Sequence, residues 1–323
     1  MAKTSAKKIV LFNEEILPGS SKEINFSLAK LLTNTHVDVP IFIERSKIDG
    51  PTVLFTAGIH GDEVNGIEIV RQLISKRINQ PKIGTIICIP IINIFGFLQK
   101  IREFPDGRDL NRSFPGARSG SLAAQVAYKI MSEILPLVDY CMDFHTGGSS
   151  RFNAPHIRIE AKDKKLAQLA QTFNAPFILH SKNLNKSFRN ACRKQGIPML
   201  LYEGGKSNSI DTVVSNTGVN GSKRVLAHLG MLKNRFKVSK PSKQSIVITK
   251  SKWIRAHASG MFKPAIKVGN FVSQGEVIGH ITDPYGKIHF WIKATNDGYI
   301  INVNEAPLIY QGDALFHIST TLN

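Results

Sequence analysis

Residues Val53-Leu54-Phe55-Thr56-Ala57-Gly58-Ile59-His60-Gly61-Asp62-Glu63 decide the fold class. The first five form an apolar run that predicts a buried strand, and the glycines that follow predict a turn. Beyond the turn, apolar residues recur with the spacing of one helix face, at Ile67, Val70, Leu73 and Ile74. A buried strand that turns directly into an amphipathic helix is typical of α/β proteins.

The same alternation of strands and helices continues to about Met231. Further strands are predicted at 85–90, 138–144 and 197–202, and further helices near 122–135, 164–173, 187–195 and 219–232. Between Asn93 and Ser119 lies a loop rich in Gly, Pro, Asp and Arg. Loops longer than about 15 residues are uncommon inside compact domains and usually carry function. We therefore expect site residues in this loop.

After Lys233 no helical period appears, and 240–243 (Lys-Pro-Ser-Lys) resembles a linker. Residues 274–281 (Gln-Gly-Glu-Val-Ile-Gly-His-Ile) return as 311–318 (Gln-Gly-Asp-Ala-Leu-Phe-His-Ile). Two similar all-β halves predict a small domain with approximate two-fold symmetry. The pattern resembles the lipoyl/biotinyl barrel–sandwich fold, but 282–295 lacks the carrier signatures, so Lys287 and Lys293 are not expected to hold a cofactor. The predicted domains are 1–240 and 241–323.

The composition is that of an ordinary soluble globular protein, with 42% hydrophobic and 20% charged residues in a chain of 323. No apolar run approaches the roughly 20 residues of a membrane helix, and the apolar run at 9–12 is too short for a signal-peptide core. Cys88, Cys141 and Cys192 lie in apolar stretches, which favours buried, reduced thiols. These features predict a cytoplasmic protein.

The net charge is +18, and residues 212–275 contain twelve basic residues and no acidic one. This interval indicates either an electropositive face that attracts acidic ligands or an ordinary solvated surface. No nucleic-acid-binding signature accompanies the charge, so no nucleic-acid partner is expected.

Polar residues occur at the predicted ends of three strands, where ligands of α/β sheets gather. His60, Glu63 and His145 form a His2Glu set, which is typical of a catalytic zinc site with one open position. Glu203 ends an otherwise apolar strand and could activate a water molecule there. The long loop adds groups suited to binding a carboxylate, namely Arg102, Arg108, Asn111 and Arg112.

Four ordered motifs carry a resemblance to a known family: Gly58-Ile59-His60-Gly61-Asp62-Glu63, residues 106–116 (Asp-Gly-Arg-Asp-Leu-Asn-Arg-Ser-Phe-Pro-Gly), Asp143-Phe144-His145 and Tyr202-Glu203-Gly204-Gly205. Together they resemble the zinc-dependent succinylglutamate desuccinylase/aspartoacylase family, a branch of the metallocarboxypeptidase-like fold. The resemblance spans nearly the whole chain. It implies a mixed central sheet flanked by helices, followed by the small C-terminal all-β barrel–sandwich domain.

The resemblance also implies roles for individual residues. His60, Glu63 and His145 would bind one zinc ion, and Glu203 would act as general base and then as acid. Arg102 would stabilise the oxyanion, and the substrate's α-carboxylate would bind Asn111 and Arg112.

Two further roles stay open at this point. The arginine that binds the acyl group is either Arg189 or Arg193. A tyrosine of the C-terminal domain closes the site in the aspartoacylase branch, but the local match places Leu308 there, so that Tyr310 could serve only after a register shift.

The predicted function is zinc-dependent hydrolysis of the amide bond of a small anionic N-acyl amino acid. A metallocarboxypeptidase acting on peptides or cell-wall peptides is the nearer alternative, and a polyanion-binding protein is the more distant one. The identity of the acyl group, that of the amine half and the formation of homo-oligomers are left open by the sequence.

Overall fold

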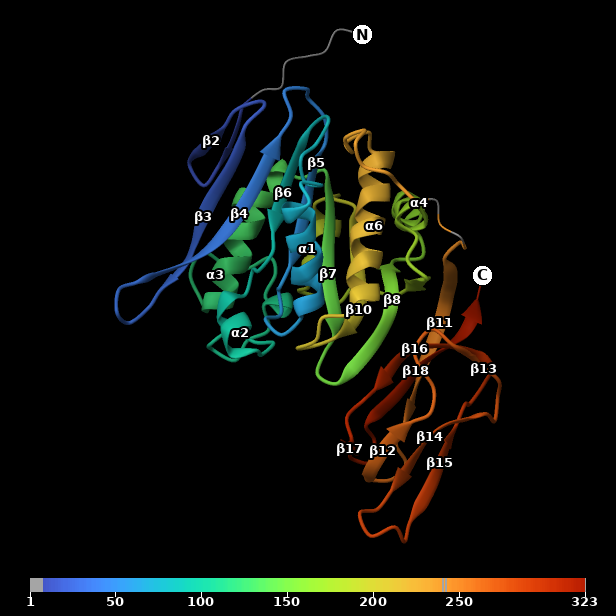
Figure 1. The fold of residues 1–323 in the computed structure, drawn as a ribbon. Helices are drawn as coiled ribbons and strands as arrows, with labels where there is room; N and C mark the ends of the chain where they lie inside the picture. Colours follow the sequence, from blue (N-terminus) through green and yellow to red (C-terminus); the bar gives the residue numbers. More distant parts are fainter. Residues whose placement is uncertain (1–7, 240, 242, 323) are drawn as a thin grey trace.

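The computed structural model describes residues 8–239, 241 and 243–322, so that Lys240 and Ser242 of the predicted linker lie outside the described residues. Its main feature is one twelve-stranded sheet in the order β13-β16-β18-β11-β9-β8-β10-β7-β5-β6-β4-β3. The sheet contains both parallel and antiparallel pairs, for example β5 parallel to β7 and β4 antiparallel to β6. The predicted mixed sheet flanked by helices is confirmed (Figure 1).

The strands of the first two thirds of the chain include the predicted ones and several that the sequence did not predict. Their bounds are β1 Ile9–Leu11, β2 Glu14–Ile16, β3 Ser21–Lys30, β4 His36–Arg45, β5 Thr52–Ala57, β6 Thr85–Ile89, β7 Tyr140–Gly147, β8 Arg151–Ile159, β9 Phe177–His180 and β10 Met199–Lys206. The helices are α1 Val64–Ser75, α2 Ile94–Gln99, α3 Leu122–Lys129, α4 Lys164–Phe173, α5 Phe188–Lys194 and α6 Thr212–His228. Short helical turns occur at Leu110–Arg112, Ile130–Ile134 and Leu135–Leu137.

The sheet has a hydrophobic core on each face because its central strands are buried on both sides. In β5, Leu54 packs in one core together with residues of α3 and α5, whereas Val53 and Phe55 pack in the other with residues of α1, α4 and α6. This alternation follows from the two-residue period of a strand. Helices on both faces leave the carboxyl ends of the parallel strands free to form a site.

Two parts of the sequence prediction were wrong in detail. The loop from Asn93 to Ser119 is not structureless, because it contains α2 and the turn at 110–112. Asn93 caps α2 by accepting a hydrogen bond from the Gly96 amide, a local signal that favours helix. The last helix, α6, begins at Thr212 rather than near 219, with Asp211 as its N-cap.

Strand β8 connects the α/β part to the C-terminal strands. Its outer edge pairs with β16 at 151–153 and with β9 at 156–159. Pro155, which has no backbone N–H, lies where β8 changes partner and where its ladder with β10 is irregular. The proline therefore costs no ladder hydrogen bond at this position, although it weakens the sequence signal for a strand.

The C-terminal strands are β11 Ile246–Arg255, β12 Gly260–Pro264, β13 Phe271–Val272, β14 Val277–Thr282, β15 His289–Lys293, β16 Gly298–Asn304, β17 Leu308–Ile309 and β18 Ala314–Leu322. The sequence repeat corresponds to a structural one: β12–β13–β14 and β16–β17–β18 share the same order of strand, short strand, turn and strand. Gly275 and Gly312 lie in these turns with φ of +84° and +91°, a backbone conformation that favours glycine. Each short strand pairs with a strand of the other half: β17 pairs with β12, and β13 pairs with β16.

Among the described residues, no helix is both long and apolar enough to cross a membrane. Cys88, Cys141 and Cys192 are buried and free, as predicted.

Candidate active site

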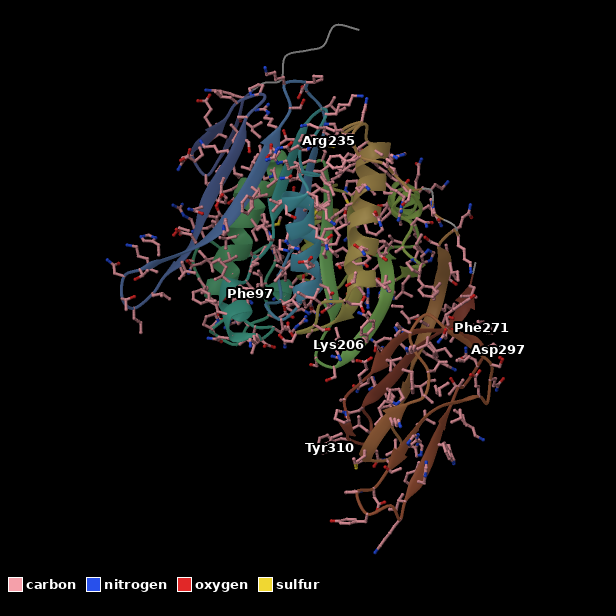
Figure 2. The ribbon with its side chains drawn as sticks, viewed as in Figure 1. Phe97, Lys206, Arg235, Phe271, Asp297 and Tyr310 are labelled. Carbon is pink, nitrogen blue, oxygen red and sulfur yellow. The ribbon has the colours of Figure 1, made fainter. Side chains whose placement is uncertain are left out.

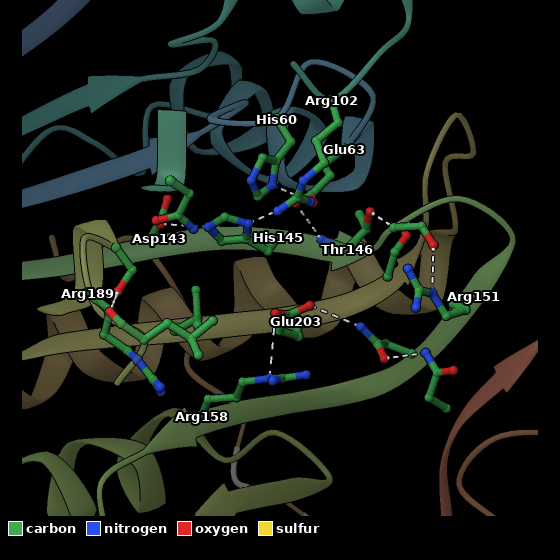
Figure 3. A pocket seen from close by; sticks show the side chains of 18 of the residues that line it. His60, Glu63, Arg102, Asp143, His145, Thr146, Arg151, Arg158, Arg189 and Glu203 are labelled. Atoms are coloured by element: carbon green, nitrogen blue, oxygen red, sulfur yellow. Dashed lines mark hydrogen bonds and ion pairs between the residues drawn. The ribbon is translucent and has the colours of Figure 1, made fainter. Parts of the chain in front are cut away.

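His60, Glu63 and His145 come together at the carboxyl ends of β5 and β7 (Figure 3). His60 follows β5, Glu63 is the N-cap residue of α1, and His145 lies in β7. One ligand atom from each lies within 4.8 Å of the others, and all three residues are buried. The three predicted metal ligands thus form one compact cluster of two imidazoles and a carboxylate.

A close contact between the backbones of α1 and β7 brings Glu63 next to His145. A Cβ atom added to Gly66 would lie 2.4 Å from the carbonyl oxygen of Phe144, so only glycine lets α1 approach β7 this closely. The side chain of Glu63 makes no capping hydrogen bond to its own helix. Its two oxygens lie instead 2.6 Å from Nδ1 of His60 and 2.8 Å from Nδ1 of His145.

The second nitrogen of each imidazole faces an aspartate. His145 Nε2 lies 2.7 Å from Oδ2 of Asp143, whose Oδ1 accepts a hydrogen bond from the Thr56 hydroxyl at 2.7 Å. His60 Nε2 lies 3.2 Å from Oδ1 of Asp109. Carboxylates placed behind histidines are the usual second layer of a metal site, because they orient the ring and increase its basicity.

The charges of the cluster are tightly interdependent. Burial favours neutral Glu63, but His60 and His145 outweigh it and hold the pKa of Glu63 well below its ordinary value. Burial likewise lowers the pKa of His145, yet Asp143 and Glu63 raise that pKa well above its ordinary value. The carboxylates of Glu63 and Asp143 therefore stabilise positive charge at this position.

Glu203 lies next to the cluster because β10 runs parallel to β7 and pairs Glu203 directly with His145. Asn153 Nδ2 donates to Oε2 of Glu203 at 3.0 Å, and Nε of Arg158 lies 3.5 Å from Oε1. The carboxylate is half-buried, so that it combines fixed partners with access to the cavity.

The loop after α2 brings Arg102 to the cluster. Its guanidinium donates to Oδ2 of Asp109 from Nε (3.2 Å) and Nη2 (2.9 Å), and to Glu63 Oε1 from Nη1 (3.3 Å). Asn111 and Arg112 also line the cavity. Arg108 does not; it is exposed at the tip of a turn and pairs with Asp106 at 3.6 Å.

The two arginines of α5 lie in different places. Arg189 is buried, lines the cavity and donates to Ser181 Oγ and the Lys182 carbonyl. Burial lowers its pKa to about 10, and it makes no ion pair within the described part of the chain. Arg193 is exposed, outside this cavity, with its Nε 3.9 Å from Glu160.

The cavity has a volume of about 360 Å³ and contains groups that the sequence did not predict. Arg151, Asn153 and Arg158 enter it from β8, whose apolar positions do alternate but are interrupted by Pro155. Five arginines line it in all: Arg102, Arg112, Arg151, Arg158 and Arg189. Such a cavity is suited to a small anionic ligand.

The C-terminal strands contribute Trp253 from β11 and Asn302 from β16 to the cavity wall. Leu308 and Tyr310, the candidates for a closing residue, are 70% and 78% exposed and are not among the residues that line the cavity. Figure 2 shows Tyr310 on the C-terminal strands, below Lys206 at the end of β10.

Comparisons of the sequence with known proteins identify related proteins. Residues 49–229 match the sequence profile of the succinylglutamate desuccinylase/aspartoacylase catalytic domain. A curated relative, the N-alpha-acetyl-L-2,4-diaminobutyric acid deacetylase of Halomonas elongata, is 28% identical over 261 residues, which cover 76% of this chain and 75% of the relative.

Two solved structures share the fold. A succinylglutamate desuccinylase/aspartoacylase from Rhodobacter sphaeroides superposes with a TM-score of 0.81 at 24% identity, covering 94% of this chain and 95% of the other. The ectoine utilization protein EutE (DoeB) from Ruegeria pomeroyi, in a product-bound structure, gives 0.83 at 22% identity, covering 99% and 100%. With the catalytic-domain match extending over more than half of its length, the chain belongs to the succinylglutamate desuccinylase/aspartoacylase family.

Proposed function

We propose that the protein is a metal-dependent amidohydrolase that removes the acyl group from a small anionic N-acyl amino acid. One observation carries the proposal: Glu203 is paired with His145 across β10 and β7, next to the His60–Glu63–His145 cluster and inside an arginine-lined cavity. The name of the Halomonas relative, a deacetylase of an N-acetylated amino acid, supports the same reaction class.

The donor set fits zinc. Two imidazole nitrogens and one carboxylate, with an aspartate behind each ring, match the ligands of catalytic zinc sites in type and number. We therefore assign His60, Glu63 and His145 as ligands of one Zn²⁺ ion. When bound, the ion would polarise the acyl carbonyl group and increase the acidity of a water molecule.

The side chains around this site would transfer the proton and stabilise the oxyanion. Glu203 takes a proton from the attacking water and later delivers it to the leaving nitrogen, the role of a general base that becomes a general acid. Arg102, held by Asp109, supplies a fixed positive charge for the developing oxyanion.

Substrate binding would use the polar ends of the cavity. Asn111 and Arg112 bind the α-carboxylate. Arg189 binds a further anionic or carbonyl group of the substrate, because it is buried at the cavity and, among the described residues, is paired only with neutral groups. Arg193 and Arg108 lie outside the cavity, and we assign them no contact with the substrate.

The C-terminal strands support a small substrate rather than a polypeptide. Trp253 and Asn302 form part of the cavity wall, so these strands limit the space in front of Glu203. We infer that residues 1–240 form the catalytic domain and 241–323 a separate β domain. The separate hydrophobic cluster of the C-terminal strands supports this division.

The decisive experiment replaces the base and leaves the metal ligands intact. Purified Glu203→Gln should bind as much zinc as the wild type by elemental analysis. It should hydrolyse N-acyl amino acids roughly 10²- to 10⁴-fold more slowly, the usual contribution of a general base. Glu133→Gln, at an exposed glutamate of the short helix after α3, is the matched control and should retain wild-type rates.

The substrates should include N-acetyl and N-succinyl amino acids beside peptides of two to six residues, with release of the amine as the readout. Near-native activity of Glu203→Gln would remove Glu203 from the mechanism. Turnover of longer peptides at rates equal to those of N-acyl amino acids would favour the metallocarboxypeptidase instead.

A further inference from the structure

A buried amide oxygen at the cavity has no partner. Asn302 lies on β16, is only 3% exposed and lines the cavity. Its Oδ1 atom is buried without a hydrogen-bond partner among the described residues. Leaving a buried acceptor unpaired is unfavourable, so such an atom in a residue of the cavity wall indicates that a ligand supplies the donor.

The orientation of this amide follows from Glu203. An ionised carboxylate only accepts hydrogen bonds, so Asn153 must direct its Nδ2 group to Glu203, at 3.0 Å. Oδ1 of Asn153 then faces Asn302 and accepts a hydrogen bond from Asn302 Nδ2, at 2.7 Å. Because both amide orientations are fixed in this way, Oδ1 is the atom of Asn302 that remains unpaired.

The strand pairing fixes the position of Asn302 as well as its orientation. Asn153 on β8 pairs with Asn302 on β16, which pairs with His317 on β18, which in turn pairs with Trp253 on β11. The rings of His317 and Trp253 are stacked with centroids 4.5 Å apart. Asn302 is therefore held between neighbours on both sides and stays in the cavity wall.

This row lies at one end of the cavity. Asn153 is two residues from Arg151, and Figure 3 shows Arg151 and Arg189 on opposite sides of Glu203. Asn111, assigned to the α-carboxylate, accepts a hydrogen bond from the Phe188 amide at 2.8 Å, next to Arg189. The carboxylate of the substrate and Asn302 thus belong to different ends of the cavity.

We propose that Oδ1 of Asn302 is a specificity site that accepts a hydrogen bond from an N–H or O–H donor of the substrate, at the end remote from its α-carboxylate. The inference rests on the proposed N-acyl amino acid substrate. Ammonium, hydroxyl and amide groups satisfy the orphan oxygen, a methyl group leaves it unpaired, and a carboxylate oxygen is repelled by it. The substrate class is accordingly an N-acyl amino acid that carries such a donor on its side chain or on its acyl group.

Isosteric ligands test this assignment. N-acetyl-norvaline, N-acetyl-homoserine and N-acetyl-2,4-diaminobutyrate differ at one terminal atom of the side chain, and N-propanoyl- and N-glycoloyl-alanine differ in the same way on the acyl group. Binding of each to the zinc-loaded wild-type protein is measured by calorimetry, and turnover is recorded in parallel. In one of the two sets, the donor ligand should bind about tenfold or more tightly than its methyl isostere, the expected value of one buried hydrogen bond to a polar or charged group.

Variants at two residues, Asn302 and Asn153, test the acceptor and its neighbour. Asn302→Leu, with Asn302→Ala as a second variant that cannot clash, should bind donor and methyl ligands equally. Asn153→Leu removes both the contact to Glu203 and the partner that orients the Asn302 amide, so its preference for donors and its turnover should both fall. A thermal melt of each variant verifies that it is folded.

The outcomes distinguish this inference from the proposed reaction. Donor-dependent binding without hydrolysis would leave the specificity site standing and refute the reaction. Hydrolysis with equal affinity for donor and methyl ligands in both sets would refute the specificity site alone. The specificity site would also be refuted if the donor preference survived in both Asn302 variants, or if the wild-type protein bound no member of either set.

Discussion

Asp143→Asn tests whether the aspartate behind His145 contributes to metal binding. Asp143 is 1% exposed, and its two oxygens each make a 2.7 Å contact, one with His145 Nε2 and one with the Thr56 hydroxyl. Asparagine can direct its oxygen to His145 and its Nδ2 group to Thr56, whose hydroxyl can rotate to accept. The substitution therefore removes the charge and leaves the geometry.

The magnitude follows from this burial. Loss of such a carboxylate typically lowers metal affinity about 10- to 100-fold, which corresponds to about 1.4–2.7 kcal/mol. Because no water can replace the buried charge of Asp143, we expect the upper half of that range. Asp109 lies 3.2 Å from His60 with its side chain 19% exposed, so that Asp109→Asn should fall in the lower half.

The assay is competition for zinc between the protein and a chelator of known affinity, followed by elemental analysis. Asp139→Asn is the matched control, because Asp139 precedes the same strand and its carboxylate accepts a hydrogen bond from the Thr52 amide, at 2.8 Å. Its zinc affinity should equal that of the wild type. If Asp143→Asn held zinc as tightly as this control, the second layer of the site would have no energetic role.

Three further predictions concern packing, pH and salt. Gly66→Ala should lower the free energy of unfolding by about 1–3 kcal/mol because the new methyl group meets the Phe144 carbonyl; unchanged denaturant unfolding would contradict this close contact. Burial lowers the pKa of His317 to about 4 from an ordinary 6.5, so its neutral form stabilises the fold fully above pH 6.5 and less as the pH falls toward 4. Between pH 7.5 and pH 5 the free energy of unfolding of His317→Gln should therefore fall by about 2 kcal/mol less than that of the wild type. An equal fall for both proteins in thermal or urea unfolding would argue against a buried neutral ring. If the basic interval 212–275 attracts substrate, kcat/KM for a dianionic N-acyl amino acid should fall with salt more than that for an N-acetylated neutral amino acid; an equal response would refute the attraction.

The parts of the site that could be predicted are those encoded locally. His60 and Glu63 are three residues apart at a strand-to-helix turn, and the sequence alone indicates that both belong to one edge of the sheet. His145 and Glu203 each end an apolar run, so their strands could be recognised as buried. The structure places all four of these residues at one cavity.

Arginines were harder to place because their positions depend on loop and helix geometry. Arg108 and Arg112 are four residues apart in the same loop. The turn at 104–108 directs Arg108 into solvent, and the helical turn at 110–112 brings Arg112 to the cavity. Arg189 and Arg193 lie one helical turn apart on α5. The packing of this helix decides that Arg189 and not Arg193 lines the cavity.

The contacts that the sequence could not reveal are the ones that join distant strands. Asn153 and Asn302 are 149 residues apart, and Asn153 and Glu203 are 50 apart, yet the three form one hydrogen-bonded chain. No periodic pattern relates such residues, because their proximity depends on the order of β10, β8 and β16 in the sheet. In that order β8 pairs with β16 before Pro155 and with β9 after it. The orientation of Glu203 thus depends on β8 and on the C-terminal strands, and a change in the pairing of β16 with β8 would alter the proposed base and the wall of its cavity together.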